Sequence, residues 1–300
     1  MTRTRTLLAT LAAGVVAFPA AAETLTVLED VGTSQQLYTV DSDDPSIVSD
    51  RVSITGLGAG NELLGIDYRP QTGELYGLAS SDAIYTLDVN TGAATLVGSG
   101  FSDAPNGTFF GFDFNPVIDK IRLVADVDTN FVADPDTGDA NIADTTSLFF
   151  VPGDANEGVN PNVVGIAYEN SVPNAQFTQL YAIDSELDIL AELANNTGQL
   201  ETVGSLGIDV VDILEFDISG TSGIGYLAAI ERGNTDSSLY TVNLDTGSVT
   251  FLGDFSDASG STVAGISAPP PGAAVIPTPA ALPVGLALLG GLALRRRTSA

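Results

Sequence analysis

The feature that most constrains the fold is a recurring unit of four short apolar runs, seen most clearly in residues 63–98. The runs cover residues 63–68, 74–79, 83–89 and 93–97. They are rich in residues that favour β-strands, and their apolar positions recur with a period near two. Turn-forming Gly, Pro, Asn and Asp residues separate them, so each unit is expected to form a sheet of four strands.

The first run of this unit returns along the chain at intervals of roughly 50 residues. It reads GIDY at 65–68, GFDF at 111–114, GIAY at 165–168 and, more loosely, EFDI at 215–218 and GISA at 265–268. A hairpin signal of Asn or Asp, then Thr and Gly, also recurs, and it ends at Gly92, Gly138, Gly198 and Gly247. Glycine supplies the positive φ that such a tight turn needs.

Units of four strands at this period are typical of β-propeller blades. A sheet with apolar residues on both faces buries them only between two neighbours, which a ring provides. The opening stretch, residues 24–56, holds about three strands, and one surplus strand, residues 263–268, ends the series. The sequence therefore predicts an all-β, five-bladed propeller closed by pairing of its N- and C-terminal strands. An irregular β-sandwich or two small β domains are the alternatives.

Both ends of the chain are expected to lie outside the propeller. Residues 1–22 combine Arg3 and Arg5, an apolar stretch and a run of alanines, which is typical of a secretory signal peptide. The apolar stretch 280–294 is short for a permanent membrane span of about 20 residues, and Arg295–Arg297 follow it. The expected organisation is a signal peptide (1–22), a propeller (23–268), a Pro-rich linker (269–279) and a sorting or transmembrane segment (280–300).

Composition excludes several kinds of chemistry. The chain has no Cys and no His. Disulfides, a Ser-His-Asp triad, a cysteine nucleophile and a His-ligated metal are therefore impossible.

The chain is strongly acidic, with 38 Asp and Glu against 10 Lys and Arg and a formal net charge of −28. All the acidic residues and only half of the basic ones lie within the expected propeller. Such a surface repels nucleic acid, so that partner is excluded. It favours solubility and association with divalent cations, and we interpret it first as adaptation to saline surroundings.

Three carboxylates hold the same place in the repeat, on the expected innermost strands: Asp67, Asp113 and Asp217. Close to one channel, they could bind a cation or act as acid and base on a glycosidic bond. The two equivalent positions hold Ala167 and Ser267, however, and Arg69 and Asn115 lie two residues further on, where each could pair with an Asp. We therefore favour a structural role and keep the three as candidate catalytic residues.

Residues 126–144 form the longest apparently irregular insertion and are dense in acid. Asp126, Asp128 and Asn130 fit the start of an EF-hand loop, but Phe131 replaces the required Gly and Thr137 the bidentate Glu. A looser calcium site made of carboxylate oxygens remains a hypothesis, with three candidate ligands: Asp134, Asp136 and Asp139. The alternative is a solvated hairpin with acidic turn residues.

The tail resembles a known class of sorting signals. Residues 276–280 read IPTPA, and the apolar stretch and three arginines follow. This arrangement is similar to the PEP-CTERM class in its VPLPA variant, from which Ile276 and Thr278 depart. The resemblance implies a Gram-negative bacterium, an exosortase-type processing enzyme, and delivery to the cell surface, outer membrane or extracellular matrix.

The body resembles a bacterial family known as domain-of-unknown-function family 4394. The resemblance rests on residues 111–116 (GFDFNP), 119–124 (DKIRLV), 130–138 (NFVADPDTG), 153–156 (GDAN), 160–161 (NP), 164–168 (VGIAY) and 180–184 (LYAID). The family has no established activity, so the resemblance implies no catalytic residues.

These observations favour a secreted, acidic propeller that acts as a binding or structural module rather than as an enzyme. No cofactor other than calcium is expected. The expected partners are the exosortase and extracellular polysaccharide, and contact with a membrane is expected only through the tail. Two alternatives stay open: a glycan-cleaving hydrolase that uses the channel carboxylates, and a calcium-dependent matrix adhesin.

Overall fold

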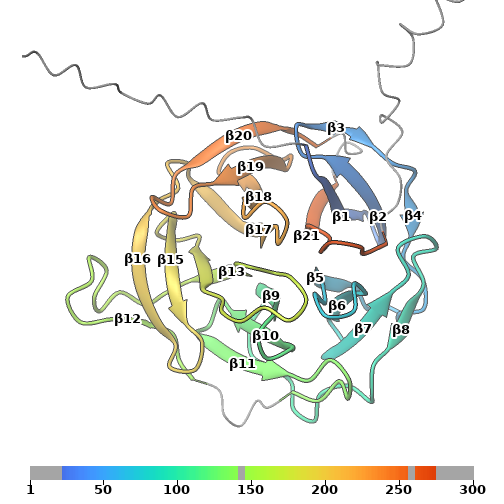
Figure 1. Ribbon diagram of the computed structural model, residues 1–300, viewed down its shortest axis with the longest axis horizontal. Coiled ribbons are helices and arrows are strands. Elements are labelled where there is room, and N and C mark those ends of the chain that lie inside the picture. Colours follow the sequence, from blue (N-terminus) through green and yellow to red (C-terminus); the bar gives the residue numbers. More distant parts are fainter. Residues whose placement is uncertain (1–21, 141–145, 256–260, 275–300) are drawn as a thin grey trace, which may run out of the picture.

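The computed structural model describes residues 22–140, 146–255 and 261–274. These residues form five β-sheets that stand as blades around a central channel (Figure 1). The prediction of an all-β, five-bladed propeller is confirmed, and the sandwich alternative is wrong. The expected signal peptide and sorting tail lie outside the described residues, apart from Ala22. The described residues contain no helix long and apolar enough to cross a membrane.

In each blade one strand lies next to the channel and the others follow outwards. Blade 1 contains β21 (Thr262–Ser267), β1 (Thr24–Val31), β2 (Ser34–Asp41) and β3 (Asp44–Val48), with β4 (Val52–Ser53) also paired to β2. Blade 2 contains β5 (Leu63–Tyr68), β6 (Leu75–Ala79), β7 (Ala83–Leu87) and β8 (Ala94–Leu96). Blade 3 contains β9 (Phe110–Asn115), β10 (Lys120–Ala125) and β11 (Thr129–Ala133). Blade 4 contains β13 (Val163–Tyr168), β14 (Leu180–Asp184), β15 (Ile189–Ala194), β16 (Gln199–Ser205) and β12 (Phe149–Phe150). Blade 5 contains β17 (Val210–Ile218), β18 (Gly225–Glu231), β19 (Ser238–Val242) and β20 (Val249–Asp254).

The terminal strands β1 and β21 lie side by side in blade 1, as predicted. They pair antiparallel, with Val27 opposite Ile266. The predicted closure of the ring by this pairing is corrected, because β1 and β21 belong to the same blade. Among the described residues the five sheets share no strand ladder, so no backbone strand pairing closes the ring from blade to blade, and the blades meet mainly through side chains.

Blade 3 departs from the predicted quartet of strands. The segment 126–144, expected to be irregular, contains β11, because Phe131 and Ala133 alternate inward and are buried in the core. Among the described residues no fourth strand follows in this sheet. Instead β12 runs on to blade 4 and pairs parallel with its outer strand β16.

The hydrophobic core lies between neighbouring blades. The second residue of each repeated tetrad points into one of these interfaces and is almost fully buried: Ile66, Phe112, Ile166, Phe216 and Ile266. Around them the buried residues form separate clusters, and each of these clusters combines side chains of adjacent sheets. Burial of these side chains between sheets stabilises the fold, and a single blade could not bury them alone.

The recurring Thr-Gly hairpins connect one blade to the preceding one. Each turn glycine has a positive φ between 70° and 80°. A Cβ added there would lie 2.2 to 2.4 Å from a backbone carbonyl oxygen of the preceding blade or of the loop that leaves it. The pairs are Gly92 with Ser53, Gly138 with Val97, Gly198 with Ser147 and Gly247 with Gly204. Glycine is therefore required both by the turn and by the close approach of the blades.

Candidate functional site: the central channel

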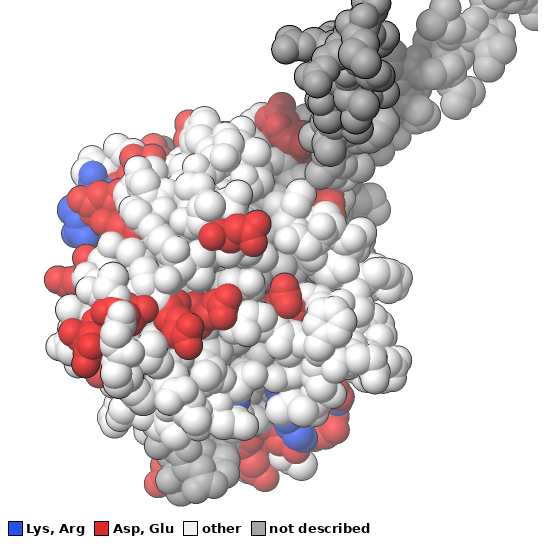
Figure 2. Space-filling model, turned by 60° about the vertical axis from the view of Figure 1, so that its left-hand side comes forward, with Lys and Arg blue, Asp and Glu red and all other residues white. Residues whose placement is uncertain are grey.

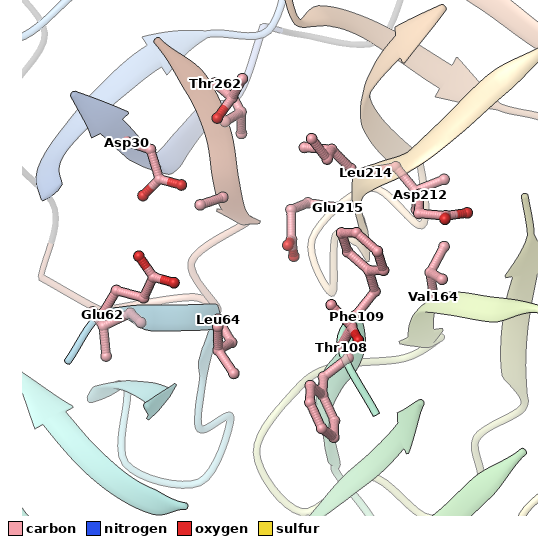
Figure 3. A pocket seen from close by; sticks show the side chains of 15 residues that line it. Asp30, Glu62, Leu64, Thr108, Phe109, Val164, Asp212, Leu214, Glu215 and Thr262 are labelled. Atoms are coloured by element: carbon pink, nitrogen blue, oxygen red, sulfur yellow. The ribbon is translucent and has the colours of Figure 1, made fainter. Parts of the chain in front are cut away.

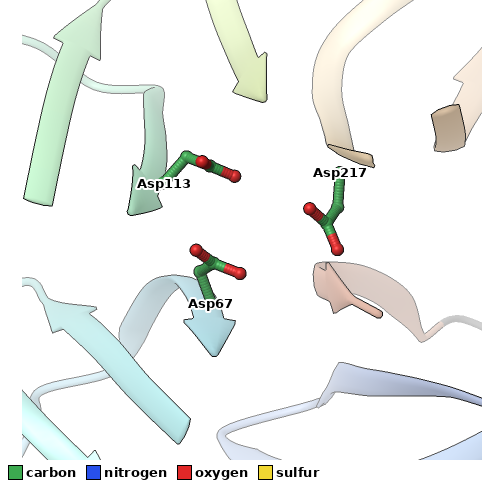
Figure 4. Close-up of side chains that lie close together, drawn as sticks. All are labelled: Asp67, Asp113 and Asp217. Atoms are coloured by element: carbon green, nitrogen blue, oxygen red, sulfur yellow. The ribbon is translucent and has the colours of Figure 1, made fainter. Parts of the chain in front are cut away.

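The five innermost strands β5, β9, β13, β17 and β21 follow one another around the channel (Figure 1). Each carries the repeated tetrad, so residues in the same place in the repeat lie at the same level of the channel. The third position places Asp67, Asp113 and Asp217 together at one level (Figure 4).

Hydrogen bonds at this level join neighbouring innermost strands, with β13 and β17 as the exception given below. The carboxylate of Asp67 accepts from the N–H of Phe114 (2.8 Å), and that of Asp113 accepts from the N–H of Tyr168 (3.1 Å). Asp217 accepts in the same way from the N–H of Ala268. In every case the donor is the fourth residue of the next tetrad, and we call this set of bonds the belt.

Ser267 continues the belt from β21 to β5. Its Oγ accepts a hydrogen bond from the N–H of Tyr68 (3.2 Å) and donates one to Asp67 (2.8 Å). The fifth position is Ala167, which has no acceptor. The N–H of Ile218 turns to Asp217, its own neighbour, at 2.7 Å.

The three carboxylates are crowded and almost inaccessible to solvent. One oxygen from each lies within 4.8 Å of the others, and the residues are only 2 to 4% exposed. Burial, together with the charge of Asp217, raises the pKa of Asp67 well above its ordinary value. Burial and the charges of Asp67 and Asp217 do the same to the pKa of Asp113. Burial raises the pKa of Asp217 to about 6.

The cluster of three aspartates can either bind a cation or retain protons. Three oxygens at these separations could ligate one hard cation, since calcium takes carboxylate oxygens at about 2.3–2.6 Å. Without a cation, like charges this close favour retention of protons, as the raised pKa values indicate. A retaining glycosidase needs carboxyls about 5–5.5 Å apart with a sugar between them, and these buried groups leave no such room.

The partners foreseen for these aspartates are wrong. Arg69 does not pair with Asp67; its guanidinium binds Asp119 and Asp136 (2.7 Å) of blade 3. Asn115 uses its side-chain oxygen to accept from the N–H groups of Val117 and Ile118. Arg69 directly follows β5 and Asn115 is the last residue of β9, so both lie beside a turn. The side chain of Asn115 therefore stabilises its own turn, and that of Arg69 binds the next blade.

The carboxylates proposed for calcium occupy the hairpin that follows β11. Asp134 accepts hydrogen bonds from two backbone N–H groups of its own turn and pairs with Lys120 (2.5 Å). Lys120 is the main cause of the lowered pKa of Asp134. Asp136 pairs with Arg69, and Asp139 donates its N–H to the Thr137 hydroxyl. Two of the three candidate ligands thus already have cationic partners.

A second feature, a cavity of about 250 Å³, lies at the mouth of the channel where the innermost strands begin (Figure 3). Its apolar lining includes Leu64, Phe109, Val164 and Leu214. Four carboxylate residues also line it, and they come from three blades and the loops next to them: Asp30, Glu62, Asp212 and Glu215. Among the described residues that line this cavity there is no Lys or Arg.

Two of the mouth carboxylates have protein partners. Asp30 accepts from the side chain of Gln35 (2.7 Å), and Asp212 accepts from Asn162 (2.9 Å) and Ser185 (2.6 Å). By contrast, the carboxylates of Glu62 and Glu215 have no hydrogen bond or ion pair with any described residue. Burial, and secondarily the charge of Asp30, raises the pKa of Glu215 well above its ordinary value.

Sequence reasoning missed all four mouth carboxylates, and Glu215 is the one that its place in the repeat could have revealed. It takes the first position of its tetrad, where the other four have Gly. A Cβ at Gly111, Gly165 or Gly265 would lie 2.6 to 2.9 Å from the nearest atom of the next blade, so this position is normally closed to side chains. Glu215 turns into the channel instead, and one of its oxygens is 3.9 Å from where a Cβ of Gly65 would be. The departure from Gly was visible in the sequence.

The basic residues of the propeller are already paired. Arg51 binds Glu29, Lys120 binds Asp134 and Arg232 binds Asp209, in addition to the pairs of Arg69. Arg122 donates to Asn130 and Asn196. Figure 2 shows acidic side chains spread over the face in view, with basic ones only beside them. The excess of carboxylates therefore has no counter-charge from the described residues.

The chain is similar to several solved structures of low sequence identity. One is described as the nidogen/laminin complex: TM-score 0.49, 12% identity, covering 82% of this chain and 98% of that one. Another is a structural genomics protein of unknown function from Bacteroides thetaiotaomicron VPI-5482 (TM-score 0.44, 14% identity). A third is the WD40 domain of Toxoplasma gondii coronin (TM-score 0.39, 9% identity). In the last two cases the match covers 78% of this chain and 58% of the other.

No curated protein matches the chain in sequence. A family model does match, over residues 36–267, which is most of the propeller. The chain belongs to the family described as "Domain of unknown function (DUF4394)".

Proposed function

We propose that this protein is a binding module exported to the cell exterior, and that the mouth of its central channel is the ligand site. The observation that carries this proposal is the contrast between the two levels of the channel. The inner carboxylates are almost wholly buried and bonded to neighbouring strands. The mouth is a cavity in which the carboxylates of Glu62 and Glu215 have no partner among the residues that the structure describes.

This contrast weighs against the hydrolase alternative. A general acid must reach the leaving oxygen of its substrate, at hydrogen-bond distance or through one water. Asp67, Asp113 and Asp217 face one another and the backbone of the next strand, and they have almost no contact with solvent. The belt accounts for them as parts of the scaffold.

Export is supported by the sequence of the two ends. Residues 1–22 have the pattern of a signal peptide, and residues 276–300 resemble a PEP-CTERM sorting signal. The proposed route is cleavage of the signal, processing of the tail by an exosortase, and retention at the surface or in the matrix. A surface polysaccharide is the proposed macromolecular partner there.

A calcium-dependent adhesin is the second candidate. It is favoured by one observation, the separation of at most 4.8 Å between oxygens of the inner aspartates. The hairpin of Asp134 and Asp136 is the weaker place for the ion, because Lys120 and Arg69 neutralise it.

The proposed function is tested with the purified full chain on a glycan array, with parallel analysis for released sugars. We expect retention of a subset of glycans without cleavage, and weaker retention by Glu215→Gln than by the exposed control Glu201→Gln. Cell fractionation should find the protein at the surface or in the matrix. Sugar release that Asp113→Asn abolishes would overturn the proposal in favour of the hydrolase.

A further inference from the structure

We infer that the mouth cavity binds the ammonium group of an organic amine, and that Glu215 is its ion-pair partner. This inference rests on the proposed function, because it names the chemical class of ligand for the same site.

The first argument is charge. Of the described residues, four with carboxylates line the cavity and none with a basic side chain does. Asp30 and Asp212 are held by hydrogen bonds from Gln35, Asn162 and Ser185, but these donors are neutral. Glu62 and Glu215 lack even a neutral donor among the described residues. Negative charge gathered in a partly enclosed space of lowered dielectric attracts a cation strongly.

The second argument concerns the size of that cation. Among the described residues, the inner aspartates are the group of three whose oxygens lie within 4.8 Å of one another. The mouth carboxylates are too widely spaced to share one bare metal ion through three ligands. A cation that donates hydrogen bonds in several directions, such as an ammonium group, suits dispersed acceptors better.

The third argument is the apolar lining. Leu64, Val164 and Leu214 offer contact to an aliphatic stem, and the ring of Phe109 also lines the cavity, where it can contribute a cation–π interaction. A volume of about 250 Å³ is near the lower end for small-molecule sites and fits a short amine or the amino-bearing end of a larger ligand.

Glu215 is the residue expected to confer specificity. It lies in the centre of the cavity in Figure 3, between Asp30 and Glu62 on one side and Asp212 on the other. Glu215 is half-buried, and its carboxylate has no partner among the described residues. Such a carboxylate is unfavourable in the unliganded protein, so a binding site is a reason for its presence.

The test is calorimetric titration of the full chain with diaminopentane at physiological ionic strength, where exposed charges are largely screened. Pentanediol serves as the neutral probe and calcium chloride as the metal probe. Glu215→Gln removes the charge but keeps the shape, and Glu215→Gly introduces the residue found in the other four tetrads. Glu201→Gln is the matched control, because Glu201 is exposed on an outer strand.

We expect one saturable site for the diamine, no heat with the diol, and binding about tenfold or more weaker in both Glu215 variants but unchanged in Glu201→Gln. Equal weakening in Glu201→Gln would overturn the inference, because the amine would then be a counter-ion to the whole surface. Absence of diamine binding would overturn it as well. Calcium binding that Glu215→Gln abolishes, without diamine binding, would identify a metal site instead. Glycan retention without diamine binding would leave the proposed function standing and reject only the amine.

Discussion

The N–H of Ile218 donates its hydrogen bond to the carboxylate of Asp217, its own neighbour in β17, at 2.7 Å. In the other four innermost strands this N–H bonds to a side chain of the preceding strand. The exception arises because Ala167 of β13 offers no acceptor. The backbone donor is satisfied in all five strands although one acceptor residue is missing, which indicates that the belt serves structure first.

A first prediction concerns Asp67. Asp67→Ala removes the acceptor for the Phe114 N–H and the Ser267 hydroxyl and leaves buried donors unsatisfied, at a cost of about 1–3 kcal/mol each. Asp67→Asn keeps one acceptor oxygen and should cost less. Urea unfolding of both variants measures the difference. A loss of ligand binding in Asp67→Asn with an unchanged melting temperature would contradict the structural role.

A second prediction concerns pH. Burial raises the folded-state pKa values of Asp67, Asp113 and Asp217 above 3.8, and the charges of neighbouring aspartates raise those of Asp67 and Asp113 further. The folded protein therefore binds more protons than the unfolded chain, and the stabilisation is fully present only below the unfolded pKa. It is lost as pH rises through the folded pKa, about 6 for Asp217.

We therefore expect the melting temperature to rise as the pH is lowered from about 8 to about 5, and Asp217→Asn to flatten this dependence. Asp103→Asn, at an exposed loop position, is the control for general charge repulsion. Parallel pH curves for the two variants would contradict a special contribution from the buried aspartates.

Much of the fold could be predicted from the sequence because local and global signals coincide. The run 63–68 matches β5 residue for residue, and the surplus strand at 263–268 corresponds to β21. Alternating apolar residues and turn glycines determine such elements locally. The irregular structure expected in 126–144 is wrong for β11, because Phe131 and Ala133 alternate into the core between acidic turns that themselves favour irregular structure.

The candidate site could be predicted only in part. Asp67, Asp113 and Asp217 share a repeat position, so their convergence follows from the ring itself. Glu62 and Asp30 belong to no repeated motif, and their meeting with Glu215 depends on how three blades assemble. The choice of partner by Arg69 likewise depends on the neighbouring blade, because Asp119 and Asp136 are 50 and 67 residues away in sequence.

A third prediction concerns the hairpins between blades. Gly138→Ala places a Cβ 2.2 Å from the carbonyl oxygen of Val97, so the contact between blades 2 and 3 must open. Gly32→Ala is a matched control, since Gly32 has a similar φ of +65° but no atom within 4 Å of an added Cβ. Both variants carry the backbone strain, and only Gly138→Ala carries the clash. Thermal unfolding should therefore show the larger loss for Gly138→Ala, and equal losses would contradict the packing role of the turn.

A fourth prediction separates protons from calcium at the inner aspartates. If protons and backbone N–H groups hold the cluster, chelator and added calcium should leave the melting temperature at neutral pH unchanged. A calcium-dependent rise that Asp113→Asn removes would support the adhesin candidate and its ion at this level of the channel. A rise that survives Asp113→Asn but disappears in Asp139→Asn would instead support the hairpin.

The last prediction connects the mouth of the channel to stability. The pKa of Glu215 is raised by burial, so its ionised form destabilises the fold above its ordinary pKa of 4.5, and this penalty is absent in acid. Glu215→Gln should therefore raise the melting temperature by roughly 2–4 °C near pH 8, about 1 kcal/mol for a domain of this size, and by little near pH 4. Glu201→Gln should change the melting temperature at neither pH.

A gain in stability together with a loss of ligand binding in Glu215→Gln would indicate that Glu215 serves function, because the substitution would then remove no structural role. Destabilisation by Glu215→Gln at both pH values would mean that the carboxylate supports the fold, and would remove the reason for placing the ligand beside it.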